Sequence, residues 1–133
     1  RKTPVDIIII PLFVSIVEEG WSDTKVAFLT AEQYLKDIKK QDVDTLVLGC
    51  THYPLLENTI STVMGSGVQL INPAINTAER VKEILTGING LNNGETEAEI
   101  QYYVSDIGQS FQKVGSHFLG RKITAECIDI ENE

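Results

Sequence analysis

The sequence has little of what disulfide-rich, membrane-spanning or nucleic-acid-binding proteins need. Only two cysteines, Cys50 and Cys127, occur among 133 residues, whereas small domains held together by disulfides carry more. No apolar run approaches the ~20 residues that a membrane-spanning helix requires. Lys and Arg together number 11, against 19 Asp and Glu, and phosphate binding requires clustered basic residues. We therefore expect no disulfide framework, no membrane association and no nucleic-acid partner.

Metal ligands are equally sparse. Cys50 and His52 are the one nearby pair, and no second pair completes a tetrahedral site, so no metal is expected. The basic groupings, Lys36 with Lys39 and Lys40 and then Arg121 with Lys122, are predicted to be solvated surface. The net charge of −8 does not exclude an anionic substrate, because a local pocket of backbone N–H groups can bind a carboxylate. Reduced thiols indicate a cytoplasmic protein.

What is present suits a globular core. The hydrophobic set makes up 42% of the residues and the charged set 23%, and the length suffices for one domain-sized core. The first residue is Arg1 rather than Met, and no signal-peptide pattern follows it. We therefore expect a processed or truncated product.

Strand and helix signals alternate along the chain. Apolar runs predict strands at Val5–Ile10, Thr45–Gly49, Val68–Ile71, Ile100–Val104 and Lys122–Ile130. Capping residues and apolar spacing predict helices that begin at Thr30 and near Pro54, one from about Ala74 to Leu85, and a short one marked by Phe111, Val114 and Phe118. A glycine- and asparagine-rich loop is expected at Gly87–Thr96. This order predicts an α/β fold with βαβ units and a parallel sheet.

Three polar residues, Cys50, Thr51 and His52, follow the second predicted strand and precede a predicted helix. Ligands of open α/β sheets bind at the carboxyl ends of the strands. Helix N-terminal amides nearby would favour a thiolate, which is a better base or nucleophile than a thiol. From the residues alone, a buried structural cysteine and a surface or structural histidine remain open alternatives.

The same segment carries a family resemblance. Gly49-Cys50-Thr51-His52-Tyr53-Pro54-Leu55-Leu56 is similar to the signature around the second catalytic cysteine of glutamate racemases. His52 favours the glutamate-specific branch over aspartate racemases, which share the fold and a cysteine at this place. Further segments resemble the same family in the expected order: Pro11–Gly20, Asn72-Pro73-Ala74 with Thr77-Ala78, Tyr103–Asp106, Phe111 and Phe118-Leu119-Gly120.

The resemblance implies a mechanism without pyridoxal phosphate, metal or nucleotide. Two thiols flank the Cα of glutamate; one removes the α-proton while the other delivers a proton to the opposite face. Cys50 would be the thiol that deprotonates L-glutamate, with His52 and Glu18 assisting it and Thr51 binding substrate. The product, D-glutamate, would serve peptidoglycan synthesis and thereby the bacterial cell wall and cell shape.

The resemblance also implies what this chain lacks. In the family the first catalytic cysteine and an accompanying aspartate come from the N-terminal half, and this chain has no candidate for either. Cys127 comes too late in the order and is predicted to pack among apolar neighbours. The family fold has two facing α/β lobes, so residues 1–71 would belong to one lobe and residues 72–133 to the other. We expect the chain to associate with the missing half or with a second copy, and to be inactive by itself.

Other interpretations remain open. A racemase for another acidic amino acid and a noncatalytic binding or assembly module are the main ones. A thiol-redox role is disfavoured, because Cys50 has no Cys-x-x-Cys partner. His117 is predicted to lie on the surface. Trp21 would either cap the cleft or lie at a subunit contact, and the sequence does not separate these two.

Overall fold

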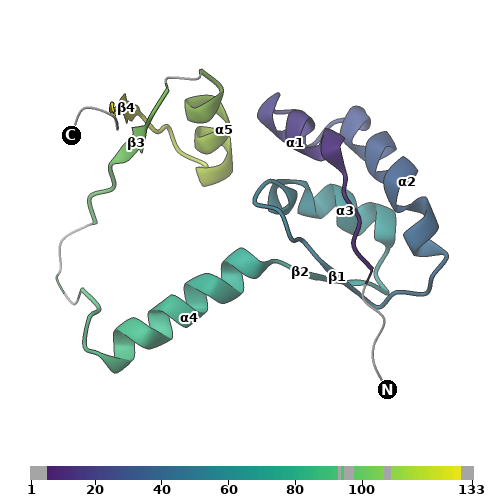
Figure 1. Ribbon diagram of the computed structural model, residues 1–133, viewed down its shortest axis with the longest axis horizontal. Coiled ribbons are helices and arrows are strands. Elements are labelled where there is room, and N and C mark those ends of the chain that lie inside the picture. Colours follow the sequence, from purple (N-terminus) through teal and green to yellow (C-terminus); the bar gives the residue numbers. More distant parts are fainter. Residues whose placement is uncertain (1–5, 93, 95–97, 107–108, 130–133) are drawn as a thin grey trace.

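The computed structural model describes residues 6–92, 94, 98–106 and 109–129. Helices and short strands alternate along the chain (Figure 1), which confirms the predicted α/β fold. In order they are α1 Pro11–Glu18, α2 Lys25–Lys39, β1 Thr45–Val47, the 3-10 helix η1 Tyr53–Leu56, α3 Glu57–Met64, β2 Gln69–Ile71, α4 Pro73–Gly87, β3 Tyr102–Val104, α5 Gln109–Leu119 and β4 Ala125–Cys127. Within these described ranges, no helix combines the length and the apolar character needed to cross a membrane.

Two parallel strand pairs form the predicted βαβ units. β1 pairs with β2, from Thr45 opposite Gln69 to Val47 opposite Ile71, and η1 and α3 make the crossover. β3 pairs with β4 in the same way, with α5 between them. Parallel neighbours require such a crossover, which is usually helical. The carboxyl ends of β1 and β2 therefore lie at one edge, where the Cys50 turn begins.

The hydrophobic core lies among α1, α2, η1 and α3. Its largest fully buried side chains come from all four of these elements: Phe13, Val17, Leu35, Leu56 and Ile60. α2 buries Ala31, Leu35 and Ile38, the apolar stripe with helical spacing in the sequence, and Ala27 in addition. Packing of amphipathic faces, rather than helix propensity, stabilises such short helices. This core holds the β1–η1 turn in a fixed place.

The helix predicted to begin at Thr30 begins five residues earlier. The side chain of Thr24 caps α2 by accepting a hydrogen bond from the Ala27 N–H, at 3.4 Å. Ser and Thr favour this N-cap position because their oxygen satisfies an otherwise unpaired helix N–H. Thr30, with Gln33 three residues later, has the sequence pattern of a capping box, but both residues lie inside the helix, and the prediction of its start was wrong.

The predicted strand at Val5–Ile10 is also corrected. Residues 6–10 have no regular secondary structure, and Val5 lies outside the described residues. Ile7 and Ile9 are exposed while Ile10 is buried, so apolar character alone was a misleading strand signal. Directly after it comes α1, a helix that the sequence analysis did not predict. Pro11 occupies its first turn, and Phe13, Ile16 and Val17 form its buried face.

The other elements agree in type and differ in their ends. The strands keep three residues each because only those residues pair across to a neighbour. α4 begins at Pro73, where Asn72 caps it through a 3.1 Å bond from the Ala74 N–H, and it continues to Gly87. The predicted loop therefore begins only after Gly87, and part of it lies outside the described residues. The last predicted strand contains β4, and its final residue, Ile130, is likewise not described.

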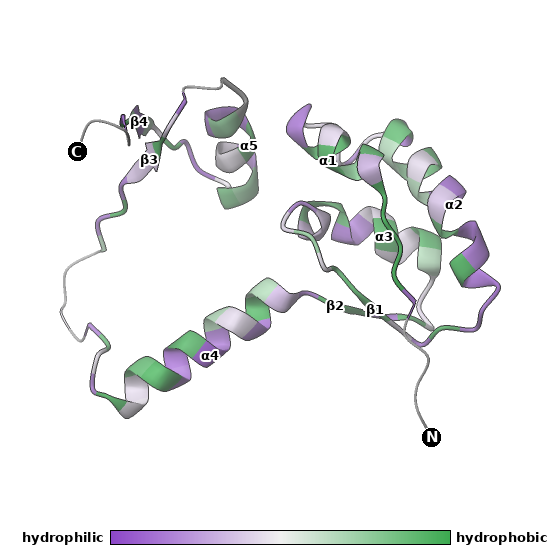
Figure 2. Cartoon of the chain, in the orientation of Figure 1, coloured by the Kyte–Doolittle hydropathy of each residue, from purple (hydrophilic) through white to green (hydrophobic). Residues whose placement is uncertain are grey.

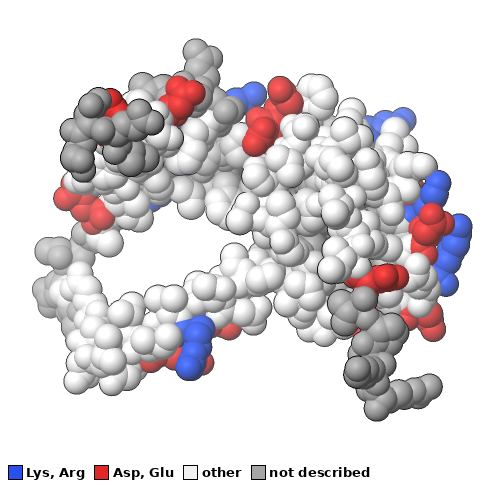
Figure 3. Space-filling model, viewed as in Figure 1, with Lys and Arg blue, Asp and Glu red and all other residues white. Residues whose placement is uncertain are grey.

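α4 extends away from the core and buries none of its residues. Hydrophobic residues nevertheless recur along it (Figure 2). Those exposed on or just after the helix are Ile75, Val81, Ile84 and Ile88. The space-filling view shows an opening between α4 and the rest of the chain (Figure 3). A helix with a solvated apolar face is typical of a surface that another segment covers.

Cys127 does not pack as predicted. Ile123 is buried and Ala125 is half-buried, but Cys127 is exposed at the end of β4. Burial at every second residue therefore holds for Ile123 and Ala125 but not for Cys127. Among the described residues, the sheet formed by β3 and β4 has two strands, which leaves too little neighbouring structure to cover its last residue.

Candidate active site

The candidate site is built on the tight turn between β1 and η1. Gly49 donates a hydrogen bond back to the Val47 carbonyl at 3.0 Å, which ends the strand. Tyr53 then donates to the Cys50 carbonyl at 3.1 Å and closes the turn. Pro54 follows in the first turn of η1, where its missing N–H costs nothing. Cys50, Thr51 and His52 are therefore presented at the carboxyl end of β1, as the sequence predicted.

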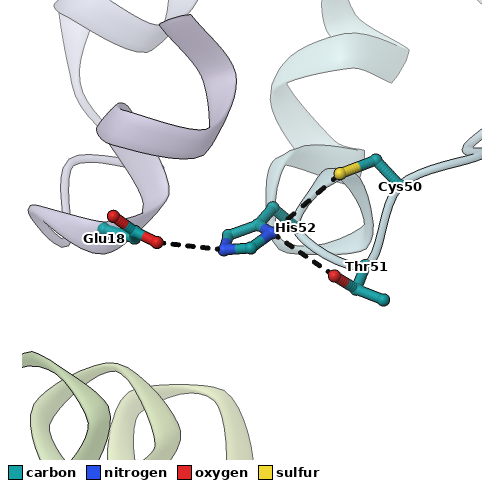
Figure 4. A network of polar contacts seen from close by, with 4 residues as sticks. All are labelled: Glu18, Cys50, Thr51 and His52. Atoms are coloured by element: carbon teal, nitrogen blue, oxygen red, sulfur yellow. Dashed lines mark hydrogen bonds and ion pairs between the residues drawn. The ribbon is translucent and has the colours of Figure 1, made fainter. Parts of the chain in front are cut away.

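Within this turn the imidazole of His52 lies at the centre of a polar chain (Figure 4). Its Nδ1 atom is 3.9 Å from Cys50 Sγ and 3.3 Å from Thr51 Oγ1. On the other side its Nε2 atom is 3.5 Å from Glu18 Oε1. All four residues named as candidates from the sequence thus meet in one place. Cys50 and His52 are half-buried, whereas Thr51 and Glu18 are exposed.

Glu18 reaches this place through α1. It is the last residue of the helix, and the buried face of Phe13, Ile16 and Val17 fixes the direction in which the helix ends. A carboxylate gains nothing from the helix dipole at a C-terminus. The His52 ring is the partner that the Glu18 carboxylate contacts at this end of the helix. Glu19, the next residue, is exposed and makes no ion pair among the described residues.

The two ring nitrogens of His52 have different neighbours, and this difference defines what the site can do. With a proton on Nε2 directed at Glu18, the Nδ1 lone pair faces the thiol and the Thr51 hydroxyl. A proton that leaves Cys50 Sγ can then pass to Nδ1, and the resulting imidazolium lies beside the Glu18 carboxylate. The arrangement can therefore generate a thiolate without any metal.

Tyr53 joins the turn to α1. Its hydroxyl oxygen accepts a bond from the Ile10 N–H at 3.2 Å and donates to the Ile10 carbonyl at 3.4 Å. Its ring meets Phe13 edge to face, with the ring centres 5.5 Å apart. No local sequence pattern indicates this contact, because it links residues 43 positions apart. The helical spacing of Phe13, Ile16 and Val17 after Pro11 was the signal that could have revealed α1.

The remaining candidates lie elsewhere. His117 is on the surface as predicted, 4.0 Å from Asp23 and with 63% of its side chain exposed. A hollow of about 150 Å³ next to it is lined by Val17, Gly20, Ser22, Leu55, Lys113, Val114 and His117. A shallower one of about 340 Å³ lies between the start of α2 and α3. Cys50 lines neither of these two hollows.

Among the residues described, no group of three or more His, Cys, Asp or Glu side chains is arranged to hold a metal ion.

Comparison with known proteins identifies relatives of this chain. No family model matches. A glutamate racemase of Geobacter metallireducens is 48% identical over 113 residues, which are 85% of this chain and 42% of that protein. The glutamate racemase isoform RacE1 of Bacillus anthracis has a similar structure, with a TM-score of 0.83 and 31% identity over 95% of this chain and 47% of that one. The chain is a homologue of glutamate racemases.

Another solved glutamate racemase, from Francisella tularensis, was crystallised with D-glutamate. It matches with a TM-score of 0.79 at 31% identity, over 92% of this chain and 46% of that one. The resemblance inferred from the sequence motifs is thereby confirmed. The chain spans less than half the length of each of these three relatives.

Proposed function

We propose that this chain supplies one proton-transfer face of a cofactor-independent glutamate racemase. The observation that carries the proposal is the polar chain Cys50–His52–Glu18 at the carboxyl end of β1, in a homologue of glutamate racemases. The Francisella tularensis relative was solved with D-glutamate, which supports glutamate as the ligand here.

The first step concerns the thiol. Cys50 gives its proton to His52 Nδ1, which turns the ring into an imidazolium. Glu18 stabilises this imidazolium through its contact with Nε2. The thiolate then takes the α-proton of L-glutamate, so that the Cα–H bond breaks and an S–H bond forms. The electron pair of the broken bond stays on the substrate as a carbanion next to its carboxylate. In the reverse direction the Cys50 thiol returns this proton.

A thiolate is too weak a base for this α-proton unless the site stabilises the carbanion. Exclusion of water and fixed dipoles aimed at the developing charge have to supply that stabilisation. Thr51 offers a hydroxyl and a backbone N–H beside Cys50, and we assign it to substrate binding. Cys50 is only half-buried and Thr51 is exposed, so this chain alone does not exclude water.

Inversion requires a second thiol on the opposite face of Cα, and we propose that a further segment of the same protein provides it. In this proposal residues 1–71 form part of one lobe, and residues 72–133 contribute to the other. The uncovered apolar side chains of α4 support a covering segment. A second copy of the chain is a further partner that we expect. Cellular D-glutamate made in the cytoplasm would enter peptidoglycan.

The decisive experiment uses the protein at the full length of its relatives. We expect Cys50→Ser to lower kcat for L-to-D conversion by about 10²–10⁴-fold, the range for loss of an acid–base group. Cys127→Ser is the matched control, because this exposed thiol lies outside the polar chain, and it should keep full activity. Equal activity of Cys50→Ser and the control would refute the proposal.

Two alternatives are settled by the same preparation. Racemisation of another acidic amino acid in preference to glutamate would move the substrate assignment and leave the mechanism in place. A full-length wild-type protein that racemises no acidic amino acid would favour a noncatalytic assembly module, for which the exposed apolar face of α4 is the supporting observation.

A further inference from the structure

The aromatic residue next to His52 connects the two parts of the candidate site. We infer that Tyr53 is a positioning residue, whose hydroxyl holds α1 in the place that brings Glu18 to His52. This inference rests on the proposed function, because it assigns Tyr53 a part in the same proton transfer.

The contacts of Tyr53 lie at the start of α1. Ile10 is the N-cap residue of the helix, and no side chain of its own caps the helix there. The Tyr53 hydroxyl instead bonds both the N–H and the carbonyl of Ile10, at 3.2 and 3.4 Å. Its ring packs edge to face on Phe13, which is fully buried. One side chain therefore binds the beginning of the helix through polar and apolar contacts.

The geometry explains why this matters at the other end of the helix. Tyr53 is the next residue after His52, and its hydroxyl bonds Ile10 at the start of α1. Glu18 lies at the other end of the same helix, eight positions after Ile10. Tyr53 therefore links the turn that carries His52 to the helix that carries Glu18. Eight residues of helix span about 12 Å, so a tilt of roughly 5° at the N-terminal end moves Glu18 by about 1 Å. The Glu18–His52 distance is already 3.5 Å, and such a movement would break the contact. Packing of Ile16 and Val17 limits the tilt, so a partial loss is expected.

The test compares Tyr53→Phe with Tyr34→Phe in the full-length protein. Both changes remove one hydroxyl from a half-buried tyrosine, but Tyr34 lies on α2, outside the site. We expect Tyr53→Phe to lower kcat about 5- to 10-fold and to leave KM within about twofold. The reason is that the change weakens proton transfer but does not alter substrate binding. Tyr34→Phe should match the wild type. Losses of equal size in both variants would overturn the inference.

A double-mutant cycle distinguishes positioning from general loosening. If Tyr53 acts through Glu18, adding Tyr53→Phe to Glu18→Gln should cause no further loss of kcat beyond about twofold. Losses that multiply in the double variant would mean that Tyr53 does not act through the ion pair.

A second measurement keeps the inference testable if the full-length wild type proves inactive and the proposed function fails. In NMR spectra, Glu18→Gln should shift the ring signals of His52 when Tyr53 is present, and should shift them much less in the Tyr53→Phe background. Amide exchange at Ile10 should also become faster in Tyr53→Phe. An equal response of the His52 ring in both backgrounds would overturn the positioning role whatever the activity.

Discussion

Removing the charge of Glu18 gives the sharpest test of the polar chain. In Glu18→Gln the side chain keeps its shape, while the carboxylate 3.5 Å from His52 Nε2 is lost. When His52 is neutral, the carboxylate has no ionic partner and the change is small. When His52 has accepted the thiol proton, the change removes an opposite charge next to an imidazolium. The substitution should therefore affect the reaction much more than the folded state.

The magnitude follows from the distance and the exposure. Two unit charges 3.5 Å apart attract by about 1 kcal/mol in water and by about 5 kcal/mol at an effective dielectric constant of about 20. The Glu18 side chain is 59% exposed and that of His52 is 31% exposed, which favours the lower part of this range. A loss of roughly 1.4 to 2.7 kcal/mol corresponds to a kcat about 10- to 100-fold lower. The free energy of unfolding should change by less than about 1 kcal/mol, as for other exposed pairs.

Glu19→Gln is the matched control, since it makes the same change of net charge at the neighbouring, exposed residue. We would measure kcat in the full-length protein and urea unfolding of both variants. The activity lost in Glu18→Gln should be absent in Glu19→Gln, and both should unfold near the wild-type midpoint. Equal kcat for the two variants would refute the role of Glu18. A large destabilisation in Glu18→Gln alone would show that the carboxylate serves folding instead.

Three further predictions concern the core, a helix cap and a surface pair. Phe13→Ala removes a fully buried ring and should lower the free energy of unfolding by about 3–5 kcal/mol in urea titrations; a cost under about 1 kcal/mol would mean that α1 is not part of the core. Thr24→Ala removes the α2 cap and should cost about 1 kcal/mol in the same assay, which an unchanged midpoint would contradict. Lys40, 2.8 Å from Asp37, lowers the pKa of that carboxyl below 3.8. The small stabilisation from this pair is therefore present above the ordinary pKa and lost as the pH falls through the lowered one, and Lys40→Met should raise the Asp37 pKa in NMR titrations.

The sequence predicted the fold where local signals and long-range packing agree. The stripe of Ala31, Leu35 and Ile38 has helical spacing, and the helix is there because that stripe meets a core. The segment before Pro11 was predicted as a strand from apolar content alone. A strand also needs a neighbour to pair with, and no local pattern records whether that neighbour is present. The exposure of Cys127 has the same origin, because burial depends on how many strands flank β4.

The site was predictable to a different degree at each residue. Cys50, Thr51 and His52 lie within three positions, so a strand end followed by a turn was enough to place them together. Glu18 came from a resemblance of motifs, since nothing in its own neighbourhood indicates a histidine 34 positions later. The Tyr53–Ile10 contact could not be predicted, because it depends on the packing angle between α1 and η1. Spacing along the chain therefore identified the reactive groups and left their mutual orientation undetermined.

The contact between α5 and α1 closes the chain into a ring, because α4 leaves the core and α5 returns to it. Closing a loop of roughly 40 residues costs about 3 kcal/mol of chain entropy. The groups that offset this cost are modest: Val114 packs against the core, and His117 faces Asp23 at 4.0 Å with both side chains mostly exposed. The ring is thus expected to open before the core unfolds, at a free energy well below that of global unfolding. A segment that covers the apolar side of α4 would therefore also stabilise the closed ring and would hold α5 beside the end of α1.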